Sequence, residues 1–248
     1  MKKVIILTRN KIKNMNKLKK SIANNKTGSR SRSATCFNYQ SLILLGFRAT
    51  GKSTLGKMLA QKIGWDFIDM DNFIEEKTKL SINQLTKEGT DWQKFRQIEL
   101  DTLQKLILKK NTIIAPGGGL AVNDIFEKKT NKTFGQLAAE FLKKQKNICL
   151  ILLQASDEII AHRIKQDEIL KINNQRPILD QKKAQEIKKQ FFNSKEVKKK
   201  ALIDNVIISS LEVLQKRKTL YHQLTKKVIN TEDDFSICVK KMKKYLQR

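Results

Sequence analysis

The residues best suited to chemistry lie together in the stretch GFRATGKS, residues 46–53, which fits the pattern Gly-x-x-x-x-Gly-Lys-[Ser/Thr]. Gly46 and Gly51 let successive backbone N–H groups turn toward one anion, and the positive end of a following helix adds to that field. Lys52 is placed to reach the β- and γ-phosphates of a nucleotide, and the Ser53 hydroxyl to ligate Mg²⁺. We therefore expect a nucleotide to contact the residues of this loop: Gly46, Arg48, Ala49, Thr50, Gly51, Lys52, Ser53 and Thr54.

The segments on either side of the loop support this interpretation. An apolar run at 42–45 predicts a buried strand before it, and an amphipathic helix is expected after it. Gly56 would let that helix lie close to the sheet. The residues expected on its apolar face are Leu55, Met58, Leu59 and Ile63. A glycine-containing turn before an ordinary helix is the alternative, but strand, loop pattern and helix all agree with a phosphate loop.

Two carboxylates follow the next expected strand, residues 65–68. Ligands bind at the carboxyl ends of the strands in an open α/β sheet, so Asp69 and Asp71 should reach the same edge as the loop. Because one residue separates them, they point in different directions, and one can face a metal ion while the other faces a substrate hydroxyl. The alternative is that Asp71 only caps the helix that begins at Asn72.

An arginine and a glutamate stand three residues apart in the helical stretch 81–110, which is interrupted near Gly89. Apolar residues of this stretch share one face: Trp92, Phe95 and Ile98. Arg96 and Glu99 are then neighbours on another face. As an exposed pair they would contribute only about 0.2 to 0.5 kcal/mol, and the sequence does not exclude that alternative.

Three consecutive glycines follow a short apolar strand at 112–115 and Pro116. Without a Cβ atom, Gly117, Gly118 and Gly119 allow the backbone to approach a ligand closely. The alternative is a flexible turn. We favour the ligand-facing interpretation, because these glycines would lie at the same sheet edge as the phosphate loop.

The rest of the chain continues the alternation of strands and helices. Strands are expected at 148–153 and 228–229, and helices at 134–144, after Ser156 and at 235–246. Arg163 should be exposed near the end of the helix after Ser156. An apolar patch at 206–208 is expected before a helical pattern that resumes at Leu211. This alternation predicts a parallel sheet covered on both faces.

Composition limits the remaining possibilities. The 248 residues include 51 Lys or Arg and 24 Asp or Glu, a formal net charge of +27. Such a charge favours an anionic partner, but the excess is spread along the chain, mostly as lysine, so we do not expect a dedicated nucleic-acid surface. Cys36, Cys149 and Cys238 are far apart and only two histidines are present, which excludes zinc-type spacing and a disulfide framework. No apolar run approaches the roughly 20 residues that a membrane span needs.

Residues 1–40 contain eleven Lys or Arg and no Asp or Glu. Most of this segment cannot pack, and we expect a basic extension of a cytoplasmic enzyme. An acid-free leader is also typical of transit peptides, so a plastid or other organelle targeting segment is the alternative. The folded domain should then cover 41–248.

Six motifs now stand in order: GFRATGKS, FIDMD, FRQIE, PGGG, RPIL and RKTLY. The ordered set resembles the shikimate kinase family over residues 41–247. The resemblance implies a P-loop kinase three-layer sandwich with a mainly five-stranded parallel sheet and a mobile lid. It also implies a monomer that uses ATP and Mg²⁺ to phosphorylate the 3-hydroxyl of shikimate. A kinase for gluconate or a nucleoside monophosphate, and a non-catalytic nucleotide- or RNA-binding protein, are the alternatives.

The resemblance also implies roles for the nucleotide side of the site. Lys52 and Ser53 would serve ATP and Mg²⁺, with Asp69 near the metal ion through water. Arg176 would move with the lid toward the γ-phosphate. Arg163 is similar to an arginine that stacks on adenine, which a planar guanidinium suits.

On the substrate side, the resemblance implies that Asp71 binds the ring hydroxyls close to the attacking one. Arg96 would hold the substrate carboxylate, with Glu99 orienting it. The glycine backbone would contact the ring: Gly117, Gly118 and Gly119. Lys52, Asp71 and Arg176 would thus serve the transfer itself.

A second carboxylate-binding arginine of the family has two candidate positions here. Lys195 stands at about the usual distance after the lid but lacks the accompanying Tyr, whereas Arg217 keeps the Arg and Tyr and precedes the final strand. We choose Arg217. This choice implies an insertion near 180–210, in addition to one near 123–147.

Overall fold

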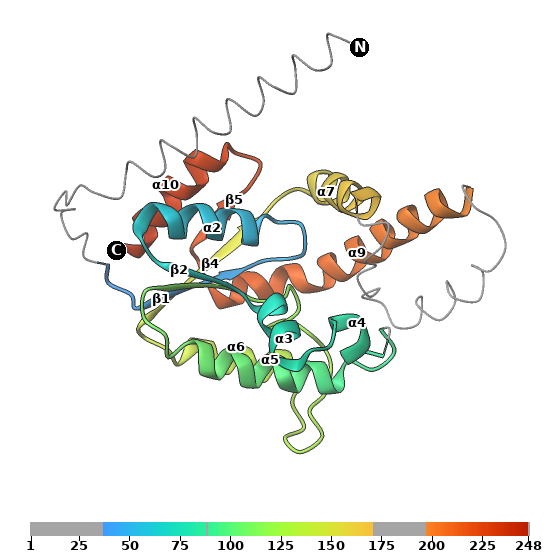
Figure 1. The fold of residues 1–248 in the computed structure, drawn as a ribbon, viewed down its shortest axis with the longest axis horizontal. Helices are drawn as coiled ribbons and strands as arrows, with labels where there is room; N and C mark the ends of the chain where they lie inside the picture. The colour runs from blue at the N-terminus through green and yellow to red at the C-terminus, as the bar shows by residue number, and fades with distance from the viewer. Residues whose placement is uncertain (1–36, 88, 171–196, 248) are drawn as a thin grey trace, which may run out of the picture. The chain divides into compact units, whose positions relative to one another are not determined.

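We describe a computed structural model of the chain at residues 37–87, 89–170 and 197–247. From Phe37 onward the chain forms one compact unit (Figure 1). Its central sheet consists of β1 (Ser41–Leu45), β2 (Asp66–Asp69), β3 (Thr112–Ala115), β4 (Ile148–Gln154) and β5 (Val228–Asn230). The strands lie in the order β2-β3-β1-β4-β5, and every neighbouring pair is parallel. The expected five-stranded parallel sheet is therefore confirmed.

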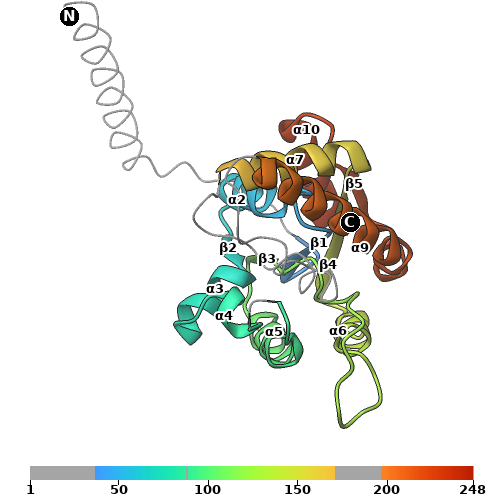
Figure 2. The same cartoon turned by 90° about the vertical axis from the view of Figure 1, so that its right-hand side faces the viewer.

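The side chains of β1 show why the sheet is covered on both faces. Successive residues of a strand point to opposite sides, and here both sets are buried. Leu42 and Leu44 pack in one core with α2 (Lys52–Ile63) and α10 (Phe235–Leu246). Ile43 and Leu45 pack in the other, which includes residues of α5 (Gln93–Leu106), α6 (Phe134–Lys143) and α9 (Val197–Leu224). Figures 1 and 2 show these helices on the two sides of the sheet, as a three-layer sandwich requires.

Close packing of α2 depends on Gly56, as expected. A Cβ atom at Gly56 would lie 2.4 Å from the ring of Phe67, a separation that real side chains do not adopt. The helix ends at Gly64, which has a left-handed conformation that glycine tolerates. The prediction that Met58 lies on the buried face was wrong, because this residue is 39% exposed.

Strand β2 is shifted by one residue from its expected position, so that Asp69 is its last residue. The chain then enters α3 (Met70–Thr78), followed by the short α4 (Ile82–Leu85). The Asp69 side chain accepts a hydrogen bond from the Asn72 backbone N–H and caps α3. Asp71 lies within the helix, so its interpretation as the cap was wrong.

Helix α9 differs most from expectation. The apolar patch at 206–208 and the helical pattern from Leu211 belong to one continuous helix that begins at Val197. The buried positions among its described side chains fall on one face with the helical period: Val206, Ser209, Ser210, Leu214, Arg217, Tyr221 and Leu224. The patch therefore supplies one buried position of a helix and is not a strand.

Helix α7 (Asp157–Leu170) packs beside α9 (Figure 2). Within the part of the chain that the structure describes, no helix is long and apolar enough to cross a membrane.

Candidate active site

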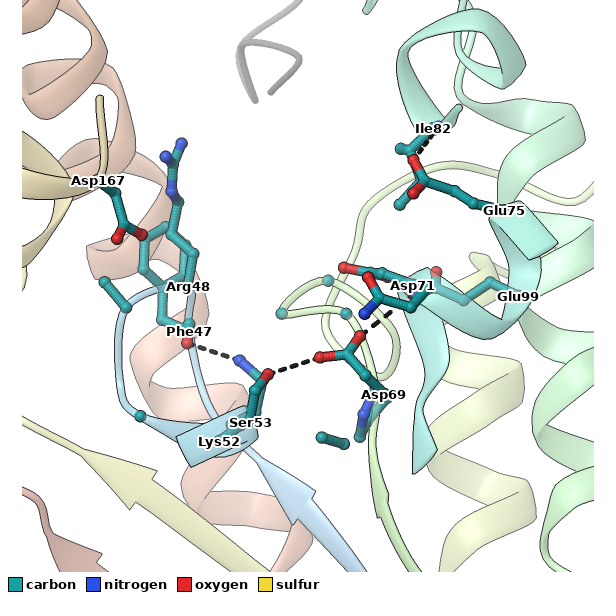
Figure 3. A pocket seen from close by; sticks show the side chains of 18 of the residues that line it. Phe47, Arg48, Lys52, Ser53, Asp69, Asp71, Glu75, Ile82, Glu99 and Asp167 are labelled. Atoms are coloured by element: carbon teal, nitrogen blue, oxygen red, sulfur yellow. Dashed lines mark hydrogen bonds between the residues drawn. The ribbon is translucent and has the colours of Figure 1, made fainter. Parts of the chain in front are cut away.

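A cleft of about 950 Å³ opens at the carboxyl ends of the strands, between the phosphate loop and helices α3 and α5 (Figure 3). It brings together most of the predicted site residues: Arg48, Ala49, Gly51, Lys52, Ser53, Thr54, Asp69, Asp71, Arg96, Glu99, Gly117, Gly118, Gly119, Arg163 and Arg217. Gly46 and Thr50 belong to the same loop but do not line the cleft. Arg176 and Lys195 lie outside the described residues.

The phosphate loop is wound tightly between β1 and α2. A Cβ atom at Gly46 would lie 2.4 Å from the carbonyl oxygen of Leu153, so only glycine fits beside β4. Thr50 turns inward, and its Oγ1 donates a hydrogen bond of 2.8 Å to the Phe47 carbonyl. Gly51, at a φ of 85°, then leads into α2, whose first residue is Lys52. The N-terminus of this helix therefore opens toward the cleft and favours an anion there.

Lys52 lies across the loop. Its Nζ donates hydrogen bonds of 2.8 Å to the carbonyl oxygens of Gly46 and Phe47, and Figure 3 shows the second of these. The ammonium group is thus held beside the backbone that encloses the phosphate position. This is the arrangement that the loop pattern predicts.

Ser53 and Asp69 provide oxygen atoms at the base of the cleft. The Ser53 hydroxyl donates to Asp69 Oδ2 at 2.6 Å (Figure 3). Hydroxyl and carboxylate oxygens suit Mg²⁺, which usually binds one or two protein groups together with substrate phosphates. The described residues contain no group of three or more His, Cys, Asp or Glu that could hold a metal ion. The oxygen atoms of Ser53 and Asp69 fit a magnesium ion that also binds substrate phosphates.

Asp71 lines the cleft on the opposite side from the phosphate loop (Figure 3). The backbone of Gly117 passes close to it, because a Cβ atom there would lie 2.9 Å from Asp71 Oδ1 and 2.7 Å from Glu99 Oε1. A side chain at position 117 would collide with both carboxylates. The glycine therefore leaves room for two acids at one end of the cleft.

Arg96 and Glu99 form a buried ion pair on α5, with relative exposures of 5% and 0%. The alternative of a surface pair is therefore wrong. The Arg96 guanidinium carbon lies 4.9 Å from the ring centre of Trp92 and 5.2 Å from that of Phe95. Burial raises the pKa of Glu99, although the charge of Arg96 opposes this shift.

The Arg96–Glu99 pair leaves two of its polar atoms without a hydrogen bond in the described structure. Arg96 Nε and Glu99 Oε1 are buried and have no hydrogen-bond partner among the described residues. A buried polar atom without a partner is costly, and such atoms in a cleft are satisfied when a ligand or water binds. Gly119 makes the guanidinium accessible from the loop side, because a Cβ atom there would lie 2.6 Å from Arg96 Nη2.

Helix α9 brings a second guanidinium to this end of the cleft. Arg217 is buried and lines the cleft. Burial lowers the pKa of its guanidinium, the nearby Arg96 charge lowers it further, and Tyr221 and Glu99 oppose the shift. Two buried arginines so close together need an anion, and Glu99 supplies one negative charge for the two.

Tyr221 connects α9 to the glycine triplet, because its hydroxyl donates a hydrogen bond to the carbonyl oxygen of Gly118. Burial raises the pKa of Tyr221 to about 12, although Arg217 and Arg96 lower it. The hydroxyl therefore stays protonated and remains a donor at neutral pH. The sequence motif contains Tyr221, but nothing in the pattern indicated this partner.

Arg163 was expected to be exposed, and that prediction was wrong. It is half-buried, because its guanidinium donates to Ala49 O at 3.2 Å, to Thr231 Oγ1 at 3.0 Å and to Thr231 O at 2.7 Å. It therefore connects α7, the phosphate loop and the turn after β5. Residues that sequence reasoning missed are the partners from distant segments, Thr231 and Glu168, for which no motif gave a signal.

Comparison with known proteins agrees with this geometry. The shikimate kinase family model matches residues 48–247. The shikimate kinase of Thermodesulfovibrio yellowstonii is 32% identical over 128 residues, which cover 51% of this chain and 65% of that protein. The shikimate kinase of Staphylococcus aureus (strain JH9) is 42% identical over 127 residues, which cover 51% of this chain and 63% of that protein. The aligned part thus spans less than two thirds of these relatives.

Two solved structures share the fold. A shikimate kinase from Acinetobacter baumannii in complex with shikimate has a TM-score of 0.60 and 22% identity, covering 83% of this chain and 92% of that one. A shikimate kinase from Bacteroides thetaiotaomicron has a TM-score of 0.58 and 24% identity, covering 84% of this chain and 99% of that one. At these identities the likeness concerns the fold.

Proposed function

Because this chain belongs to the shikimate kinase family, whose model matches residues 48–247, we propose that it transfers the γ-phosphoryl group of ATP to the 3-hydroxyl of shikimate. The products are shikimate 3-phosphate and ADP. One observation carries the proposal. Asp71 and Arg96 line the same cleft as the phosphate loop, so an acceptor held by them would lie opposite the γ-phosphate.

The nucleotide side needs alignment and charge neutralisation more than covalent chemistry. The amides of the loop at 46–53 would hold the phosphates, with Lys52 beside them and Arg163 near the base. Ser53 and Asp69 would hold the magnesium ion. When bound, that ion would neutralise charge on the phosphate oxygens. Arg176 is assigned to the γ-phosphate by family resemblance alone.

The acceptor side would recognise a carboxylate at one end and a hydroxyl at the other. Arg96 and Arg217 can bind the two oxygens of a carboxylate, which fixes the orientation of the ring. Glu99 orients Arg96, and the glycines at 117–119 let the ring approach the backbone. Asp71 then accepts the proton of the attacking hydroxyl or orients it.

The proposal is tested by ADP release with ATP and Mg²⁺ against a panel of acceptors. The panel contains shikimate, gluconate, nucleoside monophosphates and a reaction without acceptor. We expect ADP release to depend on shikimate and on Mg²⁺, and chelation by EDTA to abolish it. Release with gluconate or a nucleoside monophosphate, but not with shikimate, would contradict the assigned substrate.

Nucleic-acid binding is the remaining candidate, because the net charge of the chain is +27. Electrostatic binding of this kind weakens steeply with salt. An RNA shift assay on the chain with and without residues 1–40 separates a dedicated surface from the basic segment. We expect binding to disappear with that segment. Binding retained by the shorter chain would favour a nucleic-acid function.

A further inference from the structure

Arg48, the third residue of the phosphate loop, forms an ion pair with a residue far away in the sequence. Its Nη2 donates to Glu168 Oε1 of α7 at 2.7 Å. The side chains are only 10% and 13% exposed, so water screens the pair weakly. The loop that is expected to hold phosphate thus carries an arginine whose charge is balanced by a carboxylate of the protein.

The backbone of Arg48 lies where the nucleotide and acceptor sides of the cleft meet. A Cβ atom at Gly118 would lie 3.1 Å from the Arg48 backbone nitrogen. Arg48 also lines the cleft together with Lys52 and Asp71. The Arg48 side chain therefore starts from the junction of the two sides, although its guanidinium is turned toward Glu168 of α7.

Carboxylate and phosphate oxygens suit the same guanidinium geometry. An arginine fork donates hydrogen bonds to two oxygens of either group, and phosphate in a low-dielectric site competes well for it. Asp167, which precedes Glu168 in α7, lines the same cleft (Figure 3). A carboxylate at this end of α7 would repel a bound triphosphate unless a cation stood between them.

We propose that the Arg48 side chain binds the terminal phosphate of the nucleotide, and that Glu168 is the counter-ion which Arg48 exchanges for that phosphate. The inference rests on the proposed function for the identity of the nucleotide but not for the acceptor. Glu168 then competes with the terminal phosphate for Arg48 and so lowers the affinity for the nucleotide. Arg48 distinguishes a triphosphate from a diphosphate, because only the triphosphate reaches the position between the loop and Gly118.

Binding measurements on the full chain test this inference without any acceptor. Calorimetry with Mg²⁺ would compare a non-hydrolysable ATP analogue with ADP. We expect Arg48→Met to weaken binding of the ATP analogue about tenfold or more, the range of a lost charge-assisted hydrogen bond, and to leave ADP binding nearly unchanged. Glu168→Gln should strengthen binding of the ATP analogue about fivefold, since the competing charge is lost.

The double variant Arg48→Met, Glu168→Gln shows whether Glu168 acts through Arg48 or repels the nucleotide directly. If Glu168 acts through Arg48, Glu168→Gln should have little effect in the Arg48→Met background. Exposed residues of α7 provide matched controls: Glu158→Gln removes the same charge from the same helix, and Lys165→Met removes a cation. Both controls should leave the preference for the ATP analogue over ADP unchanged.

Other outcomes would overturn the inference. If Arg48→Met and Glu168→Gln shift the binding of both nucleotides equally, or shift only the melting temperature, the pair is a structural link between the loop and α7. Arg48→Lys keeps the charge and serves if Arg48→Met fails to fold; it should retain part of the preference. A wild-type protein that releases no ADP with shikimate would contradict the proposed acceptor but leave this comparison of nucleotides intact.

Discussion

Asp71 lines the cleft from α3, on the side opposite the phosphate loop, and its role can be isolated from nucleotide binding. Asp71→Asn keeps the shape and hydrogen-bonding capacity of the side chain but cannot take a proton. We expect kcat to fall by at least about 10²-fold, the scale of a lost general base. The dissociation constant for ATP should not change. Glu76→Gln, an exposed carboxylate of the same helix, is the control. Wild-type-like turnover by Asp71→Asn would remove Asp71 from the mechanism.

Arg96 should act mainly on acceptor binding. Its guanidinium is held by Glu99 and by the rings of Trp92 and Phe95, and its Nε remains available to a ligand. We expect Arg96→Ala to raise the KM for shikimate about 10- to 100-fold, the range of lost hydrogen bonds to a charged group. The KM for ATP should change little.

The same substitution has a structural cost, because it leaves the buried Glu99 carboxylate without its counter-ion. Steady-state kinetics must therefore be paired with thermal unfolding. The double variant Arg96→Ala, Glu99→Gln separates the two effects. The glutamine at position 99 is neutral, so no unpaired charge is buried, while the contact between Arg96 and the acceptor carboxylate is still absent. Lys94→Ala, an exposed cation on α5, is the matched control. An unchanged shikimate KM in Arg96→Ala would show that the carboxylate binds elsewhere.

Ala49 carries backbone strain that glycine would relieve. Its φ of 62° lies in the left-handed region, and its carbonyl accepts a hydrogen bond from Arg163. That conformation costs an alanine about 1 to 2 kcal/mol, whereas a glycine loses roughly 0.5 to 1 kcal/mol more entropy on folding. Ala49→Gly should therefore stabilise the protein by about 0.5 to 1 kcal/mol in urea unfolding.

The same Ala→Gly substitution should lower stability at an ordinary helical position. Ala161 lies in the middle of α7, where Ala161→Gly should cost about 1 kcal/mol. Both variants are measured in the same buffer without nucleotide. If Ala49→Gly destabilises the protein as much as Ala161→Gly does, the left-handed conformation of Ala49 costs no measurable strain energy.

At the scale of elements, the glycine triplet leaves space that the Arg96 guanidinium occupies. A methyl group at position 119 would lie 2.6 Å from Arg96 Nη2, so Gly119→Ala should displace the guanidinium. We expect the shikimate KM to rise about tenfold or more, as for a lost charge-assisted hydrogen bond, with a smaller change in the ATP KM.

Gly56 offers a control that is equally crowded but does not line the cleft. A Cβ atom there would lie 2.4 Å from the ring of Phe67, so Gly56→Ala should lower the melting temperature. It should leave the shikimate KM unchanged. If the two variants lose stability alike and neither alters the KM, Gly119 serves packing rather than the position of Arg96.

The strands and most helices could be predicted because their signals are local. The run at 112–115 is bounded by polar residues and glycines, and β3 occupies those residues. The closing helix at 235–246 is also where it was expected. The patch at 206–208 was not assigned to the helix, because three consecutive apolar residues fit both a strand and a buried helix, and only packing along the whole of α9 decides between them.

The site was predictable to the extent that its residues belong to motifs with fixed spacing. The loop, Asp69, Asp71, Arg96 and the glycine triplet share the expected sheet edge because parallel strands end there. Partners from distant segments carried no such signal. Glu168 faces Arg48 across 120 residues of sequence, and Thr231 holds Arg163 across 68.

At the scale of the whole molecule, the compact unit begins before its first strand. The ring of Phe37 packs edge-on against Trp65, with ring centres 5.2 Å apart. Asn38 N donates to Leu246 O at 3.1 Å and Gln40 N donates to Asn147 O at 2.8 Å. Tyr39 accepts a hydrogen bond of 2.6 Å from Lys227, whose Nζ lies 4.1 Å from the centre of the tyrosine ring. Asn38, Tyr39 and Gln40 thus connect the segment before β1 to the C-terminal half of the chain, and Phe37 connects it to Trp65.

Two truncations that differ by these four residues test where the functional unit starts. A chain of residues 37–248 keeps all the described side chains of both cores and of the cleft, so we expect full activity and an unchanged melting temperature. A chain of residues 41–248 loses two half-buried rings, a loss of about 2 kcal/mol at ordinary burial energies. For a chain of this size the melting temperature should fall by about 4 to 8 °C, as calorimetry can measure, while the KM values stay unchanged. Equal stability of the two truncations would show that the contacts of Phe37 and Tyr39 contribute nothing, and loss of activity in the 37–248 chain would show that the preceding residues take part in the reaction.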